Sequence, residues 1–188
     1  MGILDKYKKI RPLIEGGDLI LFHGTGFVAT VIKSSDKNKD KSWAYHNHIG
    51  IIVESHGALF IVDSNANGVQ ADRLSKRIEK YKNGGDFTII KPTVKIELID
   101  LEMRRLLSKS DDNWIRYDFF NGIKELINRR FRFKLTINLS EEKDICSDFV
   151  SRYACNLDLV NQKFKDKSIV FPEDYIRYIN NENANIVK

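Results

Sequence analysis

The chain has 188 residues, 42% of them hydrophobic, and a formal net charge of +5 at pH 7. This length and apolar content suit one compact domain with a full core, so residues 1–188 are expected to form a single domain. No apolar run is long enough to cross a membrane and no signal-peptide segment is present. These features predict a cytoplasmic protein without a transmembrane segment, and they leave export by another route open.

The hydrophobic pattern predicts strands in the first half of the chain and long helices in the second half. In chain order we expect a helix at 5–15, strands at 18–22, 48–54 and 59–63, a helix at 71–82, a strand at 87–91 and helices at 97–108, 114–130 and 145–156. The Asn-rich tail beyond Tyr178 is expected to be frayed, which leaves about residues 16–178 as the core. Strands that cluster before the long helices predict an α+β fold in which an antiparallel sheet packs against helices.

Cys146 lies at the start of the last expected helix. Asp144 is a good N-cap, so the thiol falls in the first helical turn, where unpaired N–H groups are expected to lower its pKa. The thiol also falls within the apolar arc of this helix and therefore faces whatever the helix packs against. That arc consists of Ile145, Phe149, Val150, Tyr153 and Leu157. Cysteine is among the most often buried residue types, so simple packing is the alternative to a nucleophile.

The second cysteine, Cys155, serves as an internal comparison. It lies nine residues after Cys146, about 180° around the same helix, so the two thiols cannot form a disulfide. A chain without a structural disulfide fits a reducing compartment.

A base for the thiol is expected at the start of the second strand. His46 and His48 alternate there and are expected to share a face, whereas His23 and His56 lie in or beside Gly-containing turns. His48 is favoured because Gly50, on the same face, would leave room for the helix that bears the thiol. His-x-His can also be a metal-ligand pair, but no third ligand occurs at a familiar spacing, so no metal or cofactor is expected.

A third polar group should orient the imidazole. Asp63 ends the strand that follows His48 and is the only carboxylate in that stretch. Glu54 is the competitor, but it lies six residues from His48, or about 20 Å along an extended strand. Asp63 is therefore the predicted orienting residue.

Five short motifs occur in an order that resembles a known family. They are Gly17-Asp18-Leu19-Ile20-Leu21, His48-Ile49-Gly50, Phe60-Ile61-Val62-Asp63, Arg116-Tyr117-Asp118-Phe119 and Ile145-Cys146-Ser147-Asp148-Phe149-Val150. From about residue 16 to residue 174 the chain resembles the circularly permuted papain-like hydrolases of the YaeF/YiiX type, which are permuted relatives of the NlpC-type cell-wall peptidases. The resemblance implies a permuted papain-like fold with Cys146 as the nucleophile, His48 as the base and Asp63 as the orienting acid. Relatives usually carry glutamate where this chain has Asp63.

Further residues of these motifs are candidates for the oxyanion or substrate region, namely Tyr117, Asp18 and Ser147. The backbone N–H of Cys146 is the first expected oxyanion donor, and the phenol of Tyr117 can supply a second without carrying charge. The alternative for Tyr117 is a core aromatic with a satisfied hydroxyl, because large aromatic residues flank it.

The predicted function is that of a thiol-dependent hydrolase, an amidase or peptidase, that cleaves a peptide or peptidoglycan-like amide through a thioester acyl-enzyme. Permuted relatives also include lipid-directed acyltransferases and phospholipases that use the same Cys and His. Those usually show an aromatic residue after the base and Asn before the nucleophile, where this chain has Ile49 and Ile145. A non-catalytic binding module on this fold is the third alternative.

A basic run near the middle of the second half contains Arg129, Arg130 and Arg132, interleaved with phenylalanines. This pattern can contact an anionic surface such as lipid headgroups, although most short basic runs are simply solvated faces. No RNA- or DNA-binding signature accompanies the run, so nucleic acid is not an expected partner.

Overall fold

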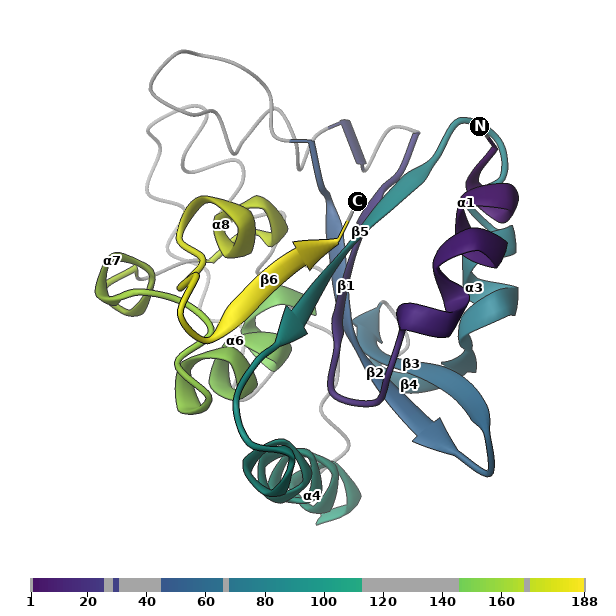
Figure 1. Ribbon diagram of the computed structural model, residues 1–188. Helices are drawn as coiled ribbons and strands as arrows, with labels where there is room; N and C mark the ends of the chain where they lie inside the picture. The colour runs from purple at the N-terminus through teal and green to yellow at the C-terminus, as the bar shows by residue number, and fades with distance from the viewer. Residues whose placement is uncertain are drawn as a thin grey trace.

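The computed structural model describes residues 2–25, 29–30, 45–65, 68–112, 146–167 and 170–187. In this part of the chain a six-stranded antiparallel sheet has the strand order β4-β3-β2-β1-β5-β6, with helices on both faces (Figure 1). The α+β class with an antiparallel sheet is therefore confirmed. None of the described helices is long and apolar enough to cross a membrane.

The elements have the following bounds. The strands are β1 (Leu19–His23), β2 (His48–Ser55), β3 (Ala58–Asn65), β4 (Gly68–Arg73), β5 (Asp86–Pro92) and β6 (Ala184–Val187). The helices are α1 (Ile3–Ile10), α3 (Leu74–Glu79), α4 (Ile96–Asp112), α6 (Cys146–Asn156), α7 (Gln162–Lys165) and α8 (Pro172–Arg177), and a 3-10 turn covers Arg11–Leu13.

The two faces of the sheet carry separate hydrophobic cores, because side chains alternate between the faces along each strand. One face packs against α1 and α3, and we call it the α1/α3 face. Its core includes Ile20, Phe22, Ile52, Ile61, Leu74, Ile78 and Phe87. The other face packs against α6 and is called the α6 face. Its core includes Leu19, Leu21, Ile49, Ile51, Val62, Val150 and Tyr153. Figure 1 shows α1 and α3 on one side of the sheet and α6, α7 and α8 on the other.

The β2–β3 connection is a two-residue hairpin turn. His56 and Gly57 have φ angles of 51° and 73°, and positive φ at both central residues is the backbone of a type I′ turn, which matches the twist of the flanking strands. This tight turn sets the register in which Ile51 pairs with Val62 and Ser55 pairs with Ala58.

Two expected elements differ from the structure. The helix expected at 71–82 is wrong at its start, because residues 71–73 belong to β4 and pair with β3, so the helix is confined to Leu74–Glu79. The frayed tail is wrong for Ala184–Val187, which form β6 and pair with β5. In both cases pairing with a strand distant in the sequence supplies hydrogen bonds that local propensity does not reveal.

Other expected elements agree within a few residues or lie outside the described part. The first helix ends at Ile10, and the chain continues in the 3-10 turn that contains Pro12, since proline cannot donate a helical hydrogen bond. The Cys helix begins at Cys146, and Asp144 and Ile145 lie outside the described residues. The helix expected at 114–130 also lies outside them.

Candidate functional site

His48 and Asp63 come together as the sequence predicts. His48 is the first residue of β2, and Asp63 lies near the end of β3, the neighbouring antiparallel strand. His48 Nε2 lies 2.8 Å from Asp63 Oδ2, and the side chains are 14% and 0% exposed. Since an ionised carboxylate only accepts, Nε2 carries the proton and donates a hydrogen bond to Asp63, and proton exchange with another group falls to Nδ1 on the other side of the ring. Asp63 therefore holds the largely buried His48 imidazole in a fixed orientation.

This pair lies on the α1/α3 face of the sheet. His48 pairs across the strands with Phe22, and the two rings lie 6.3 Å apart between centroids. Phe22 belongs to the core beneath α1 and α3. Residues paired across antiparallel strands point to the same face, so the His48 imidazole lies over the same core.

Arg77 of α3 supports Asp63 from behind, and sequence reasoning missed it. Its Nη1 lies 3.1 Å from Asp63 Oδ2 and its Nη2 donates to Asp63 Oδ1 at 3.1 Å, while Nη2 also lies 2.9 Å from Asp72 Oδ2. One signal could have identified this residue: Leu74, Arg77 and Ile78 follow helical i, i+3, i+4 spacing and are the buried residues of α3. A cation in such a stripe indicates a buried partner.

His46 points to the opposite face, so the expected shared face is wrong. Its Nδ1 lies 2.7 Å from Glu173 Oε2 of α8 and its Nε2 lies 2.9 Å from Thr88 Oγ1 of β5. Thr88 pairs with Leu21, whose side chain belongs to the α6 face. Strand β2 begins only at His48, so the alternation of a strand does not extend back to residue 46.

Glu173 is held ionised by this contact. Burial alone would raise the pKa of Glu173, but hydrogen bonds from the His46 ring and from the His46 backbone N–H at 2.8 Å outweigh it and hold the pKa below its usual value. The His46–Glu173 pair therefore joins the segment before β2 to α8.

Gly50 serves a purpose different from the one expected. A Cβ at this position would lie 2.7 Å from Cδ1 and Cγ1 of Ile61 and 3.0 Å from the Val62 carbonyl oxygen. Glycine is needed because the Ile61 side chain of the neighbouring strand already fills the space. The expected approach of the Cys helix over Gly50 is therefore wrong.

Cys146 is the first residue of α6, and its side chain lies outside the described part of the chain. Helix α6 packs on β2 and β3, the strands that carry His48 and Asp63. Val150, Tyr153 and Ala154 make this contact on the α6 face, which is opposite to the face of the His48 imidazole. The structure thus brings the body of α6 to the right strands, but not to the same side as His48. The side chain of Ser147 and all of Tyr117 also lie outside the described residues.

Asp18 does not join the site. It accepts a hydrogen bond from Glu15 N–H at 2.9 Å and lies 3.2 Å from Lys91 Nζ, in the turn that leads into β1. His48 lies opposite Phe22, four residues or about 13 Å along β1 from Asp18. Burial raises the pKa of Asp18 to about 6, partly offset by the Glu15 N–H and by Lys91. The geometry assigns Asp18 to the turn and not to the substrate.

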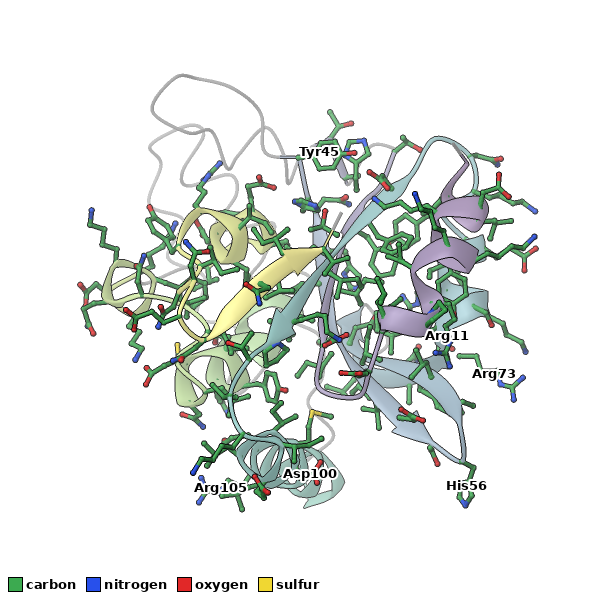
Figure 2. All side chains as sticks on the ribbon, viewed as in Figure 1. Arg11, Tyr45, His56, Arg73, Asp100 and Arg105 are labelled. Carbon is green, nitrogen blue, oxygen red and sulfur yellow. The ribbon has the colours of Figure 1, made fainter. Side chains whose placement is uncertain are left out.

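The two ends of the sheet differ in what surrounds them. Figure 2 shows Tyr45 at one end, three residues before His48, and the exposed His56 of the hairpin at the other. A hollow of about 560 Å³ opens at the Tyr45 end, lined by Gly2, Ile3, Lys6, His23, Tyr45, Lys82, Gly84, Gly85 and Asp86. Tyr45 donates a hydrogen bond to Asp86 Oδ2 at 3.0 Å. Burial, and to a smaller extent this hydrogen bond, raises the pKa of Tyr45 to about 12.

Glu54 is exposed near the His56 end, far from the imidazole. The run with Arg129, Arg130 and Arg132 lies outside the described residues.

No family model matches the chain, and no curated protein matches its sequence. Among solved structures, the fold is similar to the crystal structure of the metalloprotein YiiX from Escherichia coli O157:H7. The TM-score is 0.52 with 14% sequence identity, and the match covers 93% of this chain and 96% of that chain. This likeness shows a YiiX-like fold.

YiiX is named as a metalloprotein. In the described part of this chain, no group of three or more His, Cys, Asp or Glu side chains is placed to hold a metal ion. The one pair that the sequence offered, His46 and His48, is split between opposite faces of the sheet and contacts separate carboxylates. These residues do not fit a shared metal site.

Proposed function

We propose that the protein is a thiol-dependent hydrolase, an amidase or peptidase, in which Cys146 is the nucleophile, His48 the base and Asp63 the orienting acid. The observation that carries the proposal is the partly buried hydrogen bond between His48 Nε2 and Asp63 Oδ2 at 2.8 Å. It is supported by a YiiX-like fold in which a helix beginning with cysteine packs on the two strands that carry this pair. A permuted papain-like arrangement of these parts is included in the proposal.

In the proposed reaction Asp63 fixes the Nε2–H form of His48, so Nδ1 takes the proton from Cys146 Sγ. The thiolate attacks the carbonyl carbon of the substrate amide, and the protonated imidazole returns that proton to the leaving nitrogen. A thioester joins the acyl group to Sγ. His48 then takes a proton from water, and the hydroxide attacks the thioester carbonyl and releases the acyl group from Sγ as a carboxylic acid. The imidazolium returns its proton to the thiolate, which restores the thiol and the neutral base.

The proposal requires Cys146 Sγ to reach His48 around the end of the sheet at which β2 begins. Tyr153 donates to the Gly17 carbonyl at 2.7 Å, which ties the second half of α6 to the opposite end. Cys146 precedes Tyr153 by seven residues, or about 10 Å of helix. His48 lies opposite Phe22, about 17 Å along the strand from Gly17. The first turn of α6 must therefore cover the remaining distance and approach this end of the sheet from the α6 face, which the alkylation test below examines.

The first test compares the two thiols. Cys146 is expected to react with iodoacetamide much faster than Cys155, because burial raises the pKa of Cys155. His48→Ala should slow alkylation of Cys146 and leave Cys155 unchanged, and mass spectrometry of the labelled peptides measures both rates in one sample. Equal rates for the two thiols in the folded protein, or a Cys146 rate indifferent to His48→Ala, contradict the proposal.

A second assay identifies the bond that is cleaved. Acyl-amide, peptidoglycan-fragment and phospholipid ester substrates are compared with wild type, Cys146→Ala and the control Cys155→Ser. Cleavage of the amides that is lost only in Cys146→Ala supports an amidase. Cysteine-dependent cleavage of the phospholipid alone selects the lipid-directed alternative.

A further inference from the structure

The carboxylate that orients His48 is itself held by a two-pronged contact. Arg77 presents Nη1 to Asp63 Oδ2 and Nη2 to Asp63 Oδ1, each at 3.1 Å. Asp63 Oδ2 also accepts from His48 Nε2, so the same oxygen lies between the imidazole and the guanidinium. A planar guanidinium that meets both oxygens fixes the plane of the carboxylate as well as its place.

This ion pair is not expected to contribute much to the folding stability of the protein. The Asp63 side chain is fully buried and that of Arg77 is 9% exposed, so both charges have lost most of their hydration. Arg77 Nε, the third nitrogen of the guanidinium, is buried and has no hydrogen-bond partner among the described residues. Buried ion pairs of this kind often contribute no more than apolar side chains of equal volume. An arginine, unlike an apolar side chain, can fix the orientation of the Asp63 carboxylate and can place a positive charge beside it.

The charge matters for His48. A buried carboxylate beside an imidazole favours the imidazolium form, which cannot accept a proton. Among the described residues, Asp63 from β3 forms an ion pair with Arg77 from α3, Arg77 also pairs with Asp72 from β4, and Lys80 forms an exposed ion pair with Asp72. Arg77 lies against Asp63 directly and offsets its charge, so removal of Arg77 leaves the negative charge of Asp63 without this guanidinium and strengthens its effect on His48.

We propose that Arg77 is a positioning residue that holds the plane and offsets the charge of Asp63, so that His48 stays neutral with its proton on Nε2. This inference rests on the proposed role of His48 as a base. It makes α3 part of the catalytic support, although Arg77 touches no reacting atom in this scheme.

The test uses nitrogen NMR of the histidine rings in full-length protein, which reports both the protonation midpoint and the tautomer of His48. Arg77→Met removes the charge with little change in side-chain length. Arg77→Lys keeps the charge but cannot contact both oxygens of Asp63 with two nitrogens. Arg73→Met is the matched control, since Arg73 immediately precedes the same helix and points into solvent (Figure 2).

Arg77→Met is expected to raise the protonation midpoint of His48 by about one pH unit, a tenfold change in proton affinity. Arg77→Lys should shift the midpoint less but mix the two neutral tautomers, and Arg73→Met should change neither. An unchanged midpoint and tautomer in Arg77→Met, with only a lower melting temperature, would show a structural role and overturn the proposal. If Arg77→Met does not fold, an unmixed tautomer in Arg77→Lys overturns it equally.

The result is separable from the proposed chemistry. Iodoacetamide rates of Cys146 in wild type and His48→Ala decide whether His48 serves the thiol. The NMR midpoint decides whether Arg77 positions His48, whichever way the alkylation result falls.

Discussion

Two histidine–carboxylate pairs lie on opposite faces of the same sheet, and only one of them has the form of a site. His46 and His48 contact their carboxylates at similar distances, 2.7 and 2.8 Å. Both ring nitrogens of His46 bind protein groups, and Glu173 accepts from the ring and from the backbone of that same residue. Asp63 differs in that both of its carboxylate oxygens contact the guanidinium of Arg77. In the proposed mechanism, the two-point contact from Arg77 marks Asp63 as the residue that orients a base, whereas the His46–Glu173 pair is a structural tie.

The most direct way to break this comparison is to remove each histidine in turn. His48→Ala is expected to lower kcat by about 1000-fold or more with a small change in melting temperature, because it removes the base. His46→Ala should do the opposite, lowering the free energy of unfolding by about 1–3 kcal/mol because Glu173 loses its partner, while kcat stays within a few-fold. Steady-state kinetics and thermal unfolding of the two variants decide it. A His46→Ala enzyme that is stable but inactive would reverse the two assignments.

The carboxylates give the next largest effect. Asp63→Asn keeps the shape but no longer offers a charged acceptor to Nε2, so kcat is expected to fall on the order of 100-fold, less than for His48→Ala. The variant should also unfold more readily, since Arg77 is left as a buried cation without Asp63. Glu54→Gln is the control, because Glu54 is an exposed carboxylate on the same strand as His48. If Glu54→Gln were the more damaging change in kcat, Asp63 would not be the orienting residue.

Asp18 sharpens the contrast by its pH dependence, which is the smallest expected effect. Burial raises the pKa of Asp18 to about 6 in the folded protein, above the ordinary value of 3.8, so the folded state binds the proton more tightly than the unfolded state. The contribution of this group to stability is present at low pH and is lost as pH rises through about 6. We expect Asp18→Asn to remove about 1 kcal/mol of the difference between pH 5 and pH 7. Urea unfolding of wild type and variant at the two pH values measures it, and identical pH dependence would contradict the burial argument.

Much of the fold follows from the sequence, and so does one of the two histidine–carboxylate pairs. The alternating runs around His56-Gly57 identify β2, β3 and the turn between them, and the end of β3 identifies Asp63 as the partner of His48. These features are local, since two adjacent strands and a short turn bring the residues together.

The remaining features depend on contacts that no local pattern encodes. The spacing of Arg77 within α3 indicates a buried side, but its partner Asp63 is decided only by the packing of α3 on the sheet, and Glu173 meets His46 across 127 residues of chain. The face on which α6 packs was also mistaken, because the apolar arc of a helix does not say which side of a sheet it covers. Periodicity gives the buried side of an element, but not its neighbour.

The pairing of β6 with β5 has a consequence for the handling of this protein. Strand β6 is only four residues long and forms one edge of the sheet, a short edge of the kind that limits pairing between molecules. Behind it, β5 has four successive buried residues from Phe87 to Ile90. Removal of residues 184–187 would expose the backbone of this longer, apolar strand, so a shortened protein should self-associate through β5 and lose solubility before it loses its fold.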